Sequence, residues 1–468
     1  MKRNSAVVTF LVAGVLLGAS LVDCVGDEPE SGSSAQADAT SDQFVTDSGP
    51  VNLSDAALDA GPNPAVQVSA GWEHSCAVLK DGSLWCWGRN AAATLQSPPD
   101  NEPHGAAIQV IGVANVVSVS AGWDKTCVVE KDNSVWCWGL NLDGSLGHDT
   151  ASSGDVVCGM SYCNATPAKV VGVSAVQVAA GEFETCAVTT TGSVVCWGWN
   201  GNAIVKGPPT NEDISTPTAI AGLPSNIQRV ALSMYPGGTA CAIDSSSNVW
   251  CWGYNEHSEL GHAGLTTGDI QACGGPPAGG TDVCNPVPRE VLTAPDAGAF
   301  SNVGSIAPSF STCASQLGGS VSCWGANPAG QFGNGTVGGI QTTPALVNNL
   351  SGVASVVGTE AKCALKTNGE VWCWSNGETE ATGAYGIDAG CHNYGEGAVP
   401  CLLTPTKVAG IDAQSISLGT GIVAAITKLG QVVAWGDNGS GALGHPVGES
   451  GDDSKNHNPT PMPVQGLP

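Results

Sequence analysis

Short apolar runs flank a polar corner in residues 76–90, which read CAVLKDGSLWCWGRN. The corner, Lys80-Asp81-Gly82, places a glycine where a tight hairpin needs a left-handed backbone conformation. Counting outward from Asp81 puts Cys76 directly opposite Cys86. Opposed residues of an antiparallel pair have Cα atoms about 4.5–5.5 Å apart, within reach of a disulfide. The pattern therefore predicts two paired strands joined by a disulfide.

The same pattern recurs six more times along the chain. In five of these copies a cysteine is again followed ten residues later by a second cysteine, and a tryptophan follows that second cysteine. The predicted hairpin disulfides are Cys76–Cys86, Cys127–Cys137, Cys186–Cys196, Cys241–Cys251, Cys313–Cys323 and Cys363–Cys373. In the seventh copy, Ala424 and Ala434 stand where both cysteines belong. The loss of both partners together favours bonded pairs over independent thiols.

Each repeat holds more than its hairpin. An apolar run that ends in a small turn, such as VQVSAG, precedes the hairpin, and a P-x-x-V-x-G stretch follows it, which gives about four strands per unit. Successive hairpin tryptophans are 51, 59, 55, 72, 50 and 61 residues apart. Seven four-stranded units with variable insertions predict an all-β fold, a seven-bladed β-propeller with disulfide-stapled hairpins over residues 64–468. We expect the C-terminal strand, residues 461–467, to lie against the first repeat and close the ring.

The longer gaps between repeats hold three further cysteine pairs in glycine-rich loops. These pairs are Cys158–Cys163, Cys273–Cys284 and Cys391–Cys401. A metal site needs several converging ligands, which no single loop supplies, so we interpret the pairs as structural disulfides. The sequence predicts neither a metal site nor a cofactor, and His148, His262 and His445 are expected to be solvent-facing loop residues.

Charge and cysteine content indicate the compartment and the partner class. The 468-residue chain has a formal net charge of −26, which argues against nucleic acid and anionic membranes as partners. Nineteen cysteines in spaced pairs indicate an oxidising compartment. Lys2 and Arg3 precede an apolar run, so residues 1–24 are interpreted as a signal peptide. Residues 21–24, LVDC, resemble a bacterial lipobox that would attach a lipid to Cys24; the alternative is an ordinary secreted protein.

Residues 25–63 contain many Ser, Ala, Asp and Gly and only one aromatic residue, Phe44. Such a composition buries too little apolar surface to offset the entropy of ordering. We therefore predict a disordered acidic tether between the anchor and the propeller, so that the chain meets a membrane only through the lipid.

The repeated pattern x-x-G-x-x-x-(S/T)-C-A-(L/V)-x-x-x-G-x-(V/L)-x-C-W-G-x-N resembles the repeat of the regulator of chromosome condensation family. Residues 71–90, 122–147 and 181–200 carry it most clearly. The resemblance covers residues 65–468 and implies a seven-bladed propeller, with cysteine pairs typical of exported bacterial members. The nucleotide exchange of the nuclear founder is not carried over, because an exported acidic chain meets neither a nuclear GTPase nor DNA.

The resemblance also suggests a binding face. A secreted bacterial member that inhibits β-lactamases grips its partner with aromatic residues after the glycine of each first strand. The matching residues here are Trp72, Trp123, Phe183, Tyr235 and Phe310, with the acidic neighbours Glu73, Asp124, Glu182 and Glu184. We therefore predict an arc that binds a protein offering Lys or Arg around an apolar patch; the alternative is that these aromatics only cap their own blades.

The sequence thus favours a monomeric, non-catalytic lipoprotein of the cell envelope or surface that binds a protein partner. Two alternatives stay open. One is a hydrolase or lyase acting on polysaccharide, which would need converging carboxylates with a raised pKa. The other is a purely structural envelope protein.

Overall fold

The computed structural model describes residues 63–468 except 96–97, 101, 153, 160, 211, 235–237, 266–267, 272, 274–281, 377–387, 393–397, 449–450 and 454. These residues belong to the second of two compact units, residues 50–468. The predicted signal peptide with Cys24, the tether up to residue 62 and the predicted site residue Tyr235 lie outside the described residues.

The first repeat forms a four-stranded antiparallel sheet in chain order. Its strands are β1 (Ala65–Ala70), β2 (His74–Leu79), β3 (Leu84–Arg89) and β4 (Pro103–Gln109). The Leu79 N–H donates to the Ser83 carbonyl at 2.9 Å, which closes the predicted three-residue loop, and Gly82 has the predicted positive φ of 82°. Cys76 is the register partner of Cys86, as counting from the corner predicted.

Six further sheets repeat this arrangement. The second comprises β5 (Val116–Ala121), β6 (Lys125–Glu130), β7 (Val135–Leu140), the short 3-10 helix η1 (Leu142–Gly144), β8 (Asp155–Cys158) and β9 (Ser161–Lys169). The third comprises β10 (Ala175–Ala180), β11 (Glu184–Thr189), β12 (Val194–Trp199) and β13 (Asp213–Ala219). The fourth comprises β14 (Ile227–Leu232), β15 (Thr239–Asp244), β16 (Val249–Tyr254), β17 (Ile270–Gln271) and β18 (Val283–Glu290).

The remaining three sheets complete the set. The fifth comprises β19 (Val303–Ala307), β20 (Ser311–Gln316), β21 (Val321–Ala326) and β22 (Ile340–Leu346). The sixth comprises β23 (Val353–Gly358), β24 (Ala361–Lys366), β25 (Val371–Asn376), β26 (Asp388–His392) and β27 (Ala398–Lys407). The seventh comprises β28 (Ala413–Leu418), β29 (Ile422–Thr427), β30 (Val432–Asp437) and β31 (His457–Pro463).

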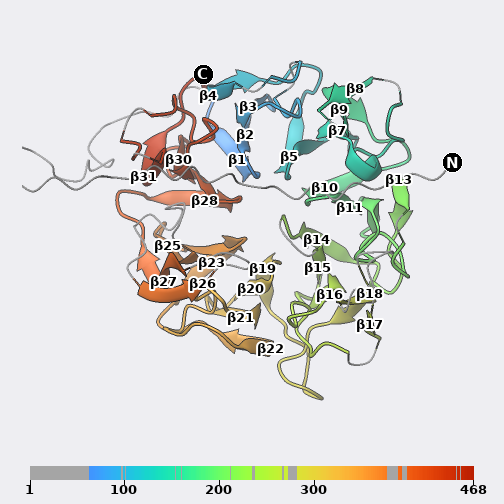
Figure 1. Cartoon of the computed structure of the whole chain (residues 1–468), viewed down its shortest axis with the longest axis vertical. Helices are drawn as coiled ribbons and strands as arrows, with labels where there is room; N and C mark the ends of the chain where they lie inside the picture. Colours follow the sequence, from blue (N-terminus) through green and yellow to red (C-terminus); the bar gives the residue numbers. More distant parts are fainter. Residues whose placement is uncertain are drawn as a thin grey trace, which may run out of the picture. The chain divides into compact units, whose positions relative to one another are not determined.

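The first strands of the seven sheets form a closed ring. Each of β1, β5, β10, β14, β19, β23 and β28 contacts the next, and β28 contacts β1 (Figure 1). The seven-bladed propeller is therefore confirmed. The C-terminal strand β31 pairs with β30 and completes the seventh blade rather than pairing with the first repeat. The ring closes by packing of β1 against β28 and β29. After β31 in the sequence, the Gln465 carbonyl accepts a hydrogen bond from the Ala107 N–H of the first blade at 2.9 Å.

Buried tryptophans tie neighbouring blades together. The indole after each hairpin's second cysteine is fully buried, and its Nε1 donates to a carbonyl of the preceding blade. Trp87 donates to Ala442 at 2.9 Å and Trp138 to Thr94 at 2.8 Å. These bonds satisfy the one polar atom of a large apolar side chain, so burial contributes stability without an unpaired donor.

Side chains also bridge the inner strands, which do not share a backbone ladder. The Gln177 amide donates to the Val230 carbonyl and accepts from the Val230 N–H, each at 2.8 Å. Gln67 bonds the backbone of Val119 in the same two-fold way at 3.1 Å. Adjacent blades are thus held in register by side chains as well as by packing.

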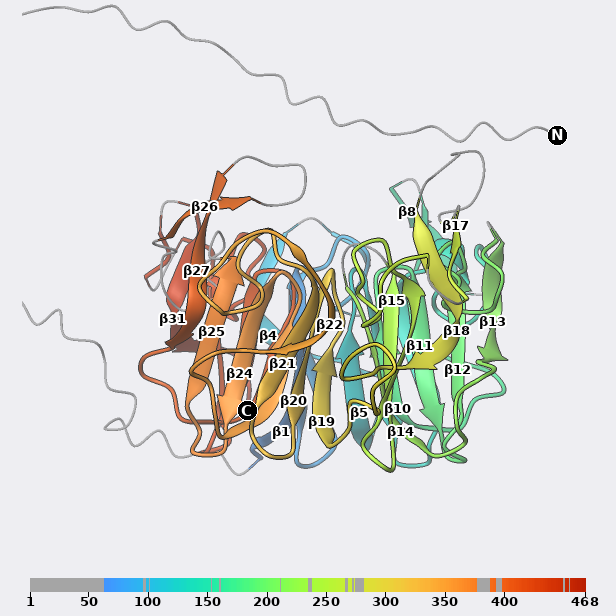
Figure 2. The ribbon, with the colours of Figure 1, turned by 90° about the horizontal axis from the view of Figure 1, so that it is seen from below.

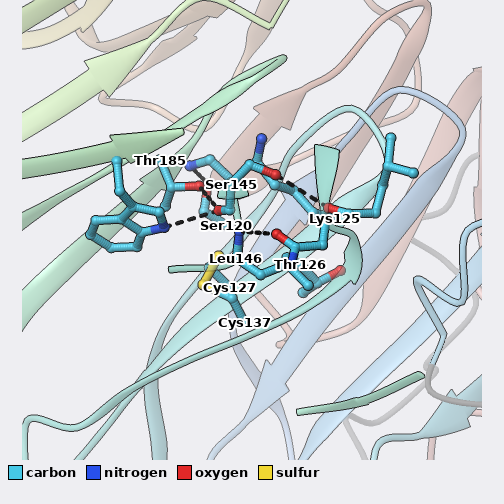
Figure 3. Close-up of a disulfide and its surroundings, with 12 residues drawn as sticks. Ser120, Lys125, Thr126, Cys127, Cys137, Ser145, Leu146 and Thr185 are labelled. Carbon is cyan, nitrogen blue, oxygen red and sulfur yellow. Dashed lines mark hydrogen bonds between the residues drawn. A yellow bond between two sulfur atoms is a disulfide. The ribbon is translucent and has the colours of Figure 1, made fainter. Parts of the chain in front are cut away.

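The six hairpin disulfides staple the second and third strands of their blades. Their Cα–Cα distances are 4.1–4.2 Å, and every cysteine in them is fully buried. Figure 3 shows the Cys127–Cys137 bridge beside Ser145, whose carbonyl accepts from the Thr185 hydroxyl of the next blade at 2.9 Å. In the seventh blade, Ala424 and Ala434 occupy the same register.

The other three cysteine pairs hold extensions of alternate blades. Cys158–Cys163, Cys273–Cys284 and Cys391–Cys401 have Cα–Cα distances of 5.8, 6.0 and 6.2 Å. The sequence predicted irregular loops here, but each pair joins a fifth strand or its flank to the outer strand of the second, fourth or sixth blade. Figure 2 shows β8, β17 and β26 projecting at one end of the sheets.

Candidate functional site

One face of the propeller carries the predicted aromatic residues together with the projecting strands. Because successive strands of a blade are antiparallel, the β1–β2 turn and the β3–β4 loop lie at the same edge of the sheet. Trp72, Trp123, Phe183 and Phe310 follow first strands, and β8, β17 and β26 lie in the connections after third strands. The aromatic turns and the disulfide-held extensions therefore share this face, which we call the aromatic face.

Four aromatic side chains on this face form a continuous row, the aromatic arc, made of Trp72, Trp123, Phe183 and Trp199. The Trp72 and Trp123 rings meet edge to face with centroids 5.0 Å apart, and Trp123 and Phe183 are 5.5 Å apart. Trp199 adds an edge-to-face contact to Phe183 at 5.7 Å. All four side chains are half-buried, so each keeps part of its surface open to solvent. The arc joins three blades, because Trp72 contacts Trp123 of the second blade and Trp123 contacts Phe183 of the third, whereas Trp199 contacts Phe183 within its own blade.

Phe310 belongs to a second cluster. Its ring centroid lies 6.4 Å from that of Tyr254 and 5.6 Å from the His257 ring. The structure thus brings together three of the predicted aromatics and places Phe310 with partners from the fourth blade.

Sequence reasoning missed Trp199, Tyr254 and Arg89. All three occupy the position after Cys-Trp-Gly, which ends the third strand at the aromatic face. Alternation of the strands could have assigned this position to the same face as Trp72. Arg89 forms an ion pair with Glu73, and its guanidinium lies 5.6 Å from the Trp72 ring centroid.

Burial shifts the pKa values of the charged residues beside the aromatic arc. Asp124 is half-buried, and burial raises its pKa to about 6. Burial, together with the nearby Glu184 carboxylate, raises the pKa of Glu182 to about 8. The Lys125 side chain is buried beneath them, and its Nζ donates to the Glu182 backbone carbonyl at 3.0 Å. Burial lowers the pKa of Lys125 to about 8.

Glu184 lies below the surface rather than on it. The residue is only 2% exposed, and its Oε1 has no hydrogen-bond partner. The sequence placed Glu184 among the contact residues, but its side chain points inward from the first position of β11. Glu184 is therefore not part of the contact surface; burial raises the pKa of its carboxyl to about 7, and the Lys125 charge partly opposes this shift.

Of the three loop histidines expected to face solvent, only His445 is buried, whereas His148 and His262 stay partly exposed and are paired with carboxylates. His148 Nε2 lies 2.9 Å from Asp155 Oδ1, and His262 Nε2 lies 2.9 Å from Asp269 Oδ1. Both aspartate side chains are fully buried. His445 and Asp452, also seven residues apart, approach to 3.6 Å. Each histidine thus lies against a buried aspartate seven residues further along the chain, and this spacing, repeated in three blades, is a sequence signal that could have predicted the pairs.

The described part of the chain shows no group of three or more His, Cys, Asp or Glu side chains that could hold a metal ion. Among the same residues, no helix is long and apolar enough to cross a membrane.

Comparison with known proteins supports the repeat assignment. The regulator of chromosome condensation (RCC1) repeat matches residues 65–92, 116–145 and 175–203. The chain is 28% identical over 199 residues to the RCC1 domain-containing protein RUG3, mitochondrial, of Arabidopsis thaliana, covering 41% of this chain and 42% of the relative. It is 26% identical to the ultraviolet-B receptor UVR8 of the same plant, covering 44% of each. The chain thus matches less than half the length of these curated relatives.

Solved structures show the same fold. Yeast RCC1 (Prp20) bound to Kap60 matches with a TM-score of 0.63 at 18% identity, over 92% of this chain and 91% of that one. Human WBSCR16 matches with a TM-score of 0.61 at 18% identity, over 82% and 94% of the two chains.

Proposed function

Because the chain carries regulator of chromosome condensation repeats in a seven-bladed propeller, we propose that it is a non-catalytic binding module whose aromatic face grips a protein partner. The aromatic arc is the single observation that carries this proposal. Half-exposed aromatic rings in a continuous row are typical of contact surfaces, and such side chains often dominate binding energy. The arc therefore supplies the apolar centre of the proposed interface.

The acidic residues beside the aromatic arc suggest the chemistry of the partner's surface. Glu73, Asp124 and Glu182 stand beside the arc, and the chain carries a net charge of −26. The Asp124 and Glu182 pKa values are raised by burial, so a nearby cation would stabilise their ionised forms. A partner with Lys or Arg around an apolar patch fits this surface.

Paired tryptophan variants test the proposal. We expect Trp72→Ala with Trp123→Ala to weaken capture of a partner from envelope extract by at least about 2 kcal/mol, roughly 30-fold in affinity. The control is Trp85→Ala with Trp136→Ala, since these half-buried indoles lie in the same two blades near the opposite ends of the strands. Equal capture by both double variants would contradict the proposal, and no capture by the wild-type protein would favour the purely structural alternative.

A second candidate is an enzyme acting on polysaccharide. The raised pKa of Glu182 and the buried Glu184 beside it favour this alternative, because glycosidases pair a protonated acid with a second carboxylate. Incubation with a panel of acidic and neutral polysaccharides tests it. Release of oligosaccharides that is lost in Glu182→Gln would establish catalysis, and no release by the wild-type protein would exclude it for that panel.

We also propose that the protein is exported and anchored as a lipoprotein. Nine cysteine pairs at disulfide distance support an oxidising location. Cys24 would carry the lipid, and stable anchoring requires more than one acyl chain. A Cys24→Ser variant should leave the detergent phase and take up no labelled fatty acid. Partitioning of the wild-type protein into the aqueous phase would refute the anchor.

A further inference from the structure

A cavity of about 510 Å³ is lined by residues of both the fourth and the fifth blades. Its walls come from β16, the connection after β16 with His262, β18, the connection after β18 and β22, and it shares no residue with the aromatic arc. The connection after β18 includes a short extra bridge between Leu292 and Ala299, within the longest spacing between successive hairpin tryptophans. The volume falls within the range of pockets that bind small molecules.

Arg289 distinguishes this cavity from the equivalent places in the other blades. It pairs in register with Cys251, and the six residues that pair with the corresponding Cys or Ala elsewhere are all uncharged. Those residues are Ile108, Ala168, Thr218, Ala345, Thr406 and Met462. The repeat does not need a charge at this position, so a structural role common to all blades does not explain the arginine.

The guanidinium of Arg289 packs closely against the backbone of Gly268, and one of its donors has no hydrogen-bond acceptor. Gly268, with φ of +93°, packs so closely against it that an added Cβ would overlap Nη2. The Arg289 Nε is buried without a hydrogen-bond partner, and the side chain forms no ion pair with any described residue. The buried Nε is closed to a ligand, but the residue lines the cavity, and a guanidinium matches the planar oxygens of a carboxylate. The cavity therefore offers a ready site for one carboxylate.

Two carboxylates line the same cavity. Glu290 and Asp296 make no ion pair with a cation in the described part of the chain. They would repel a ligand with several negative charges and attract an ammonium group. Leu292 and Pro295 also line the cavity and add apolar surface to it.

We propose that this cavity binds a small zwitterion, with its carboxylate on Arg289, its ammonium group toward Glu290 or Asp296, and an apolar body on Leu292. The chemistry is that of a free amino acid or of a dipeptide. This binding is separate from protein capture by the aromatic face, so either can fail without the other.

Calorimetric titration of the full chain with four probes tests the proposal. L-leucine and leucyl-leucine carry both charges, N-acetyl-leucine lacks the ammonium, and leucinamide lacks the carboxylate. We expect at least one zwitterion to bind, and removal of either charge from it to weaken binding at least about tenfold. Binding of leucine identifies a free amino acid as the ligand class, and binding of leucyl-leucine alone identifies a peptide.

Single substitutions test whether the zwitterion binds in this cavity. Arg289→Gln should weaken binding of the zwitterion at least about tenfold, while Arg229→Gln, which removes the same charge outside the cavity, should leave it unchanged. Glu290→Gln should weaken leucine more than N-acetyl-leucine, a comparison that holds even if Arg289→Gln lowers stability. The proposal is overturned if neither zwitterion binds, if N-acetyl-leucine binds as tightly as leucine, or if Arg289→Gln binds like the wild-type protein while folded.

Discussion

Removing one hairpin disulfide tests how the blades are held. The change is Cys127→Ala together with Cys137→Ala, which gives the second blade the residues that the seventh blade has at Ala424 and Ala434. The bridge joins residues ten apart in the sequence and closes a loop of 11 residues. In the loop-entropy model such a closure contributes roughly 2–3 kcal/mol by restricting the unfolded chain. We expect the free energy of unfolding to fall by this amount while the fold is retained.

Urea unfolding followed by tryptophan fluorescence measures the change under oxidising conditions, and the reverse variant is the control. Ala424→Cys with Ala434→Cys has the register of the six natural bridges, so it should form a seventh hairpin disulfide and raise the urea midpoint by a similar amount. Intact mass of the unreduced protein reports whether the new bridge forms. An unchanged midpoint in the double alanine variant, or free thiols in the double cysteine variant, would refute the reasoning.

Three further predictions address packing and pH. Trp138→Ala should cost roughly 3–5 kcal/mol, measured by urea unfolding, because it empties a fully buried site between blades. Gln177→Ala should cost roughly 1–3 kcal/mol in the same assay by leaving the Val230 backbone groups unpaired, while Gln228→Ala, at an exposed neighbouring position, should cost almost nothing. Burial raises the pKa of Glu182 from 4.5 to about 8, so the folded state retains a proton that the unfolded state releases, and the free energy of unfolding should fall as pH rises between these values. The free energy of unfolding of the Glu182→Gln variant should fall less, as measured by urea midpoints below pH 4.5 and above pH 8.

The fold was predictable because its determinants recur in register. The ten-residue spacing from Cys76 to Cys86, with glycine at the corner, sets the hairpin and repeats along the chain. The fifth strands were not predictable, because β8, β17 and β26 are short and depend on disulfides to outer strands rather than on an apolar period.

The candidate site was predictable only in part. Trp72, Trp123 and Phe183 occupy a repeated position, so their shared face follows from symmetry. The burial of Glu184 depends on packing against the neighbouring blade, where Lys125 lies, which alternation along one strand does not encode. The pairing of His148 with Asp155 could have been predicted, because the same seven-residue spacing recurs in the fourth and seventh blades. Phe310 contacts Tyr254 and His257 of the fourth blade, partners that its repeated position did not predict.

Site-specific photocrosslinking tests the proposed binding face most directly. A photoreactive phenylalanine derivative replaces Trp199, at the end of β12 on the aromatic face, or Trp85, near the opposite end of β3. Each protein is irradiated in envelope extract, and crosslinked species are identified by mass spectrometry. We expect one discrete crosslinked partner from position 199 and none from position 85. A crosslink from position 85 alone would place the interface on the opposite face and contradict the proposed binding face.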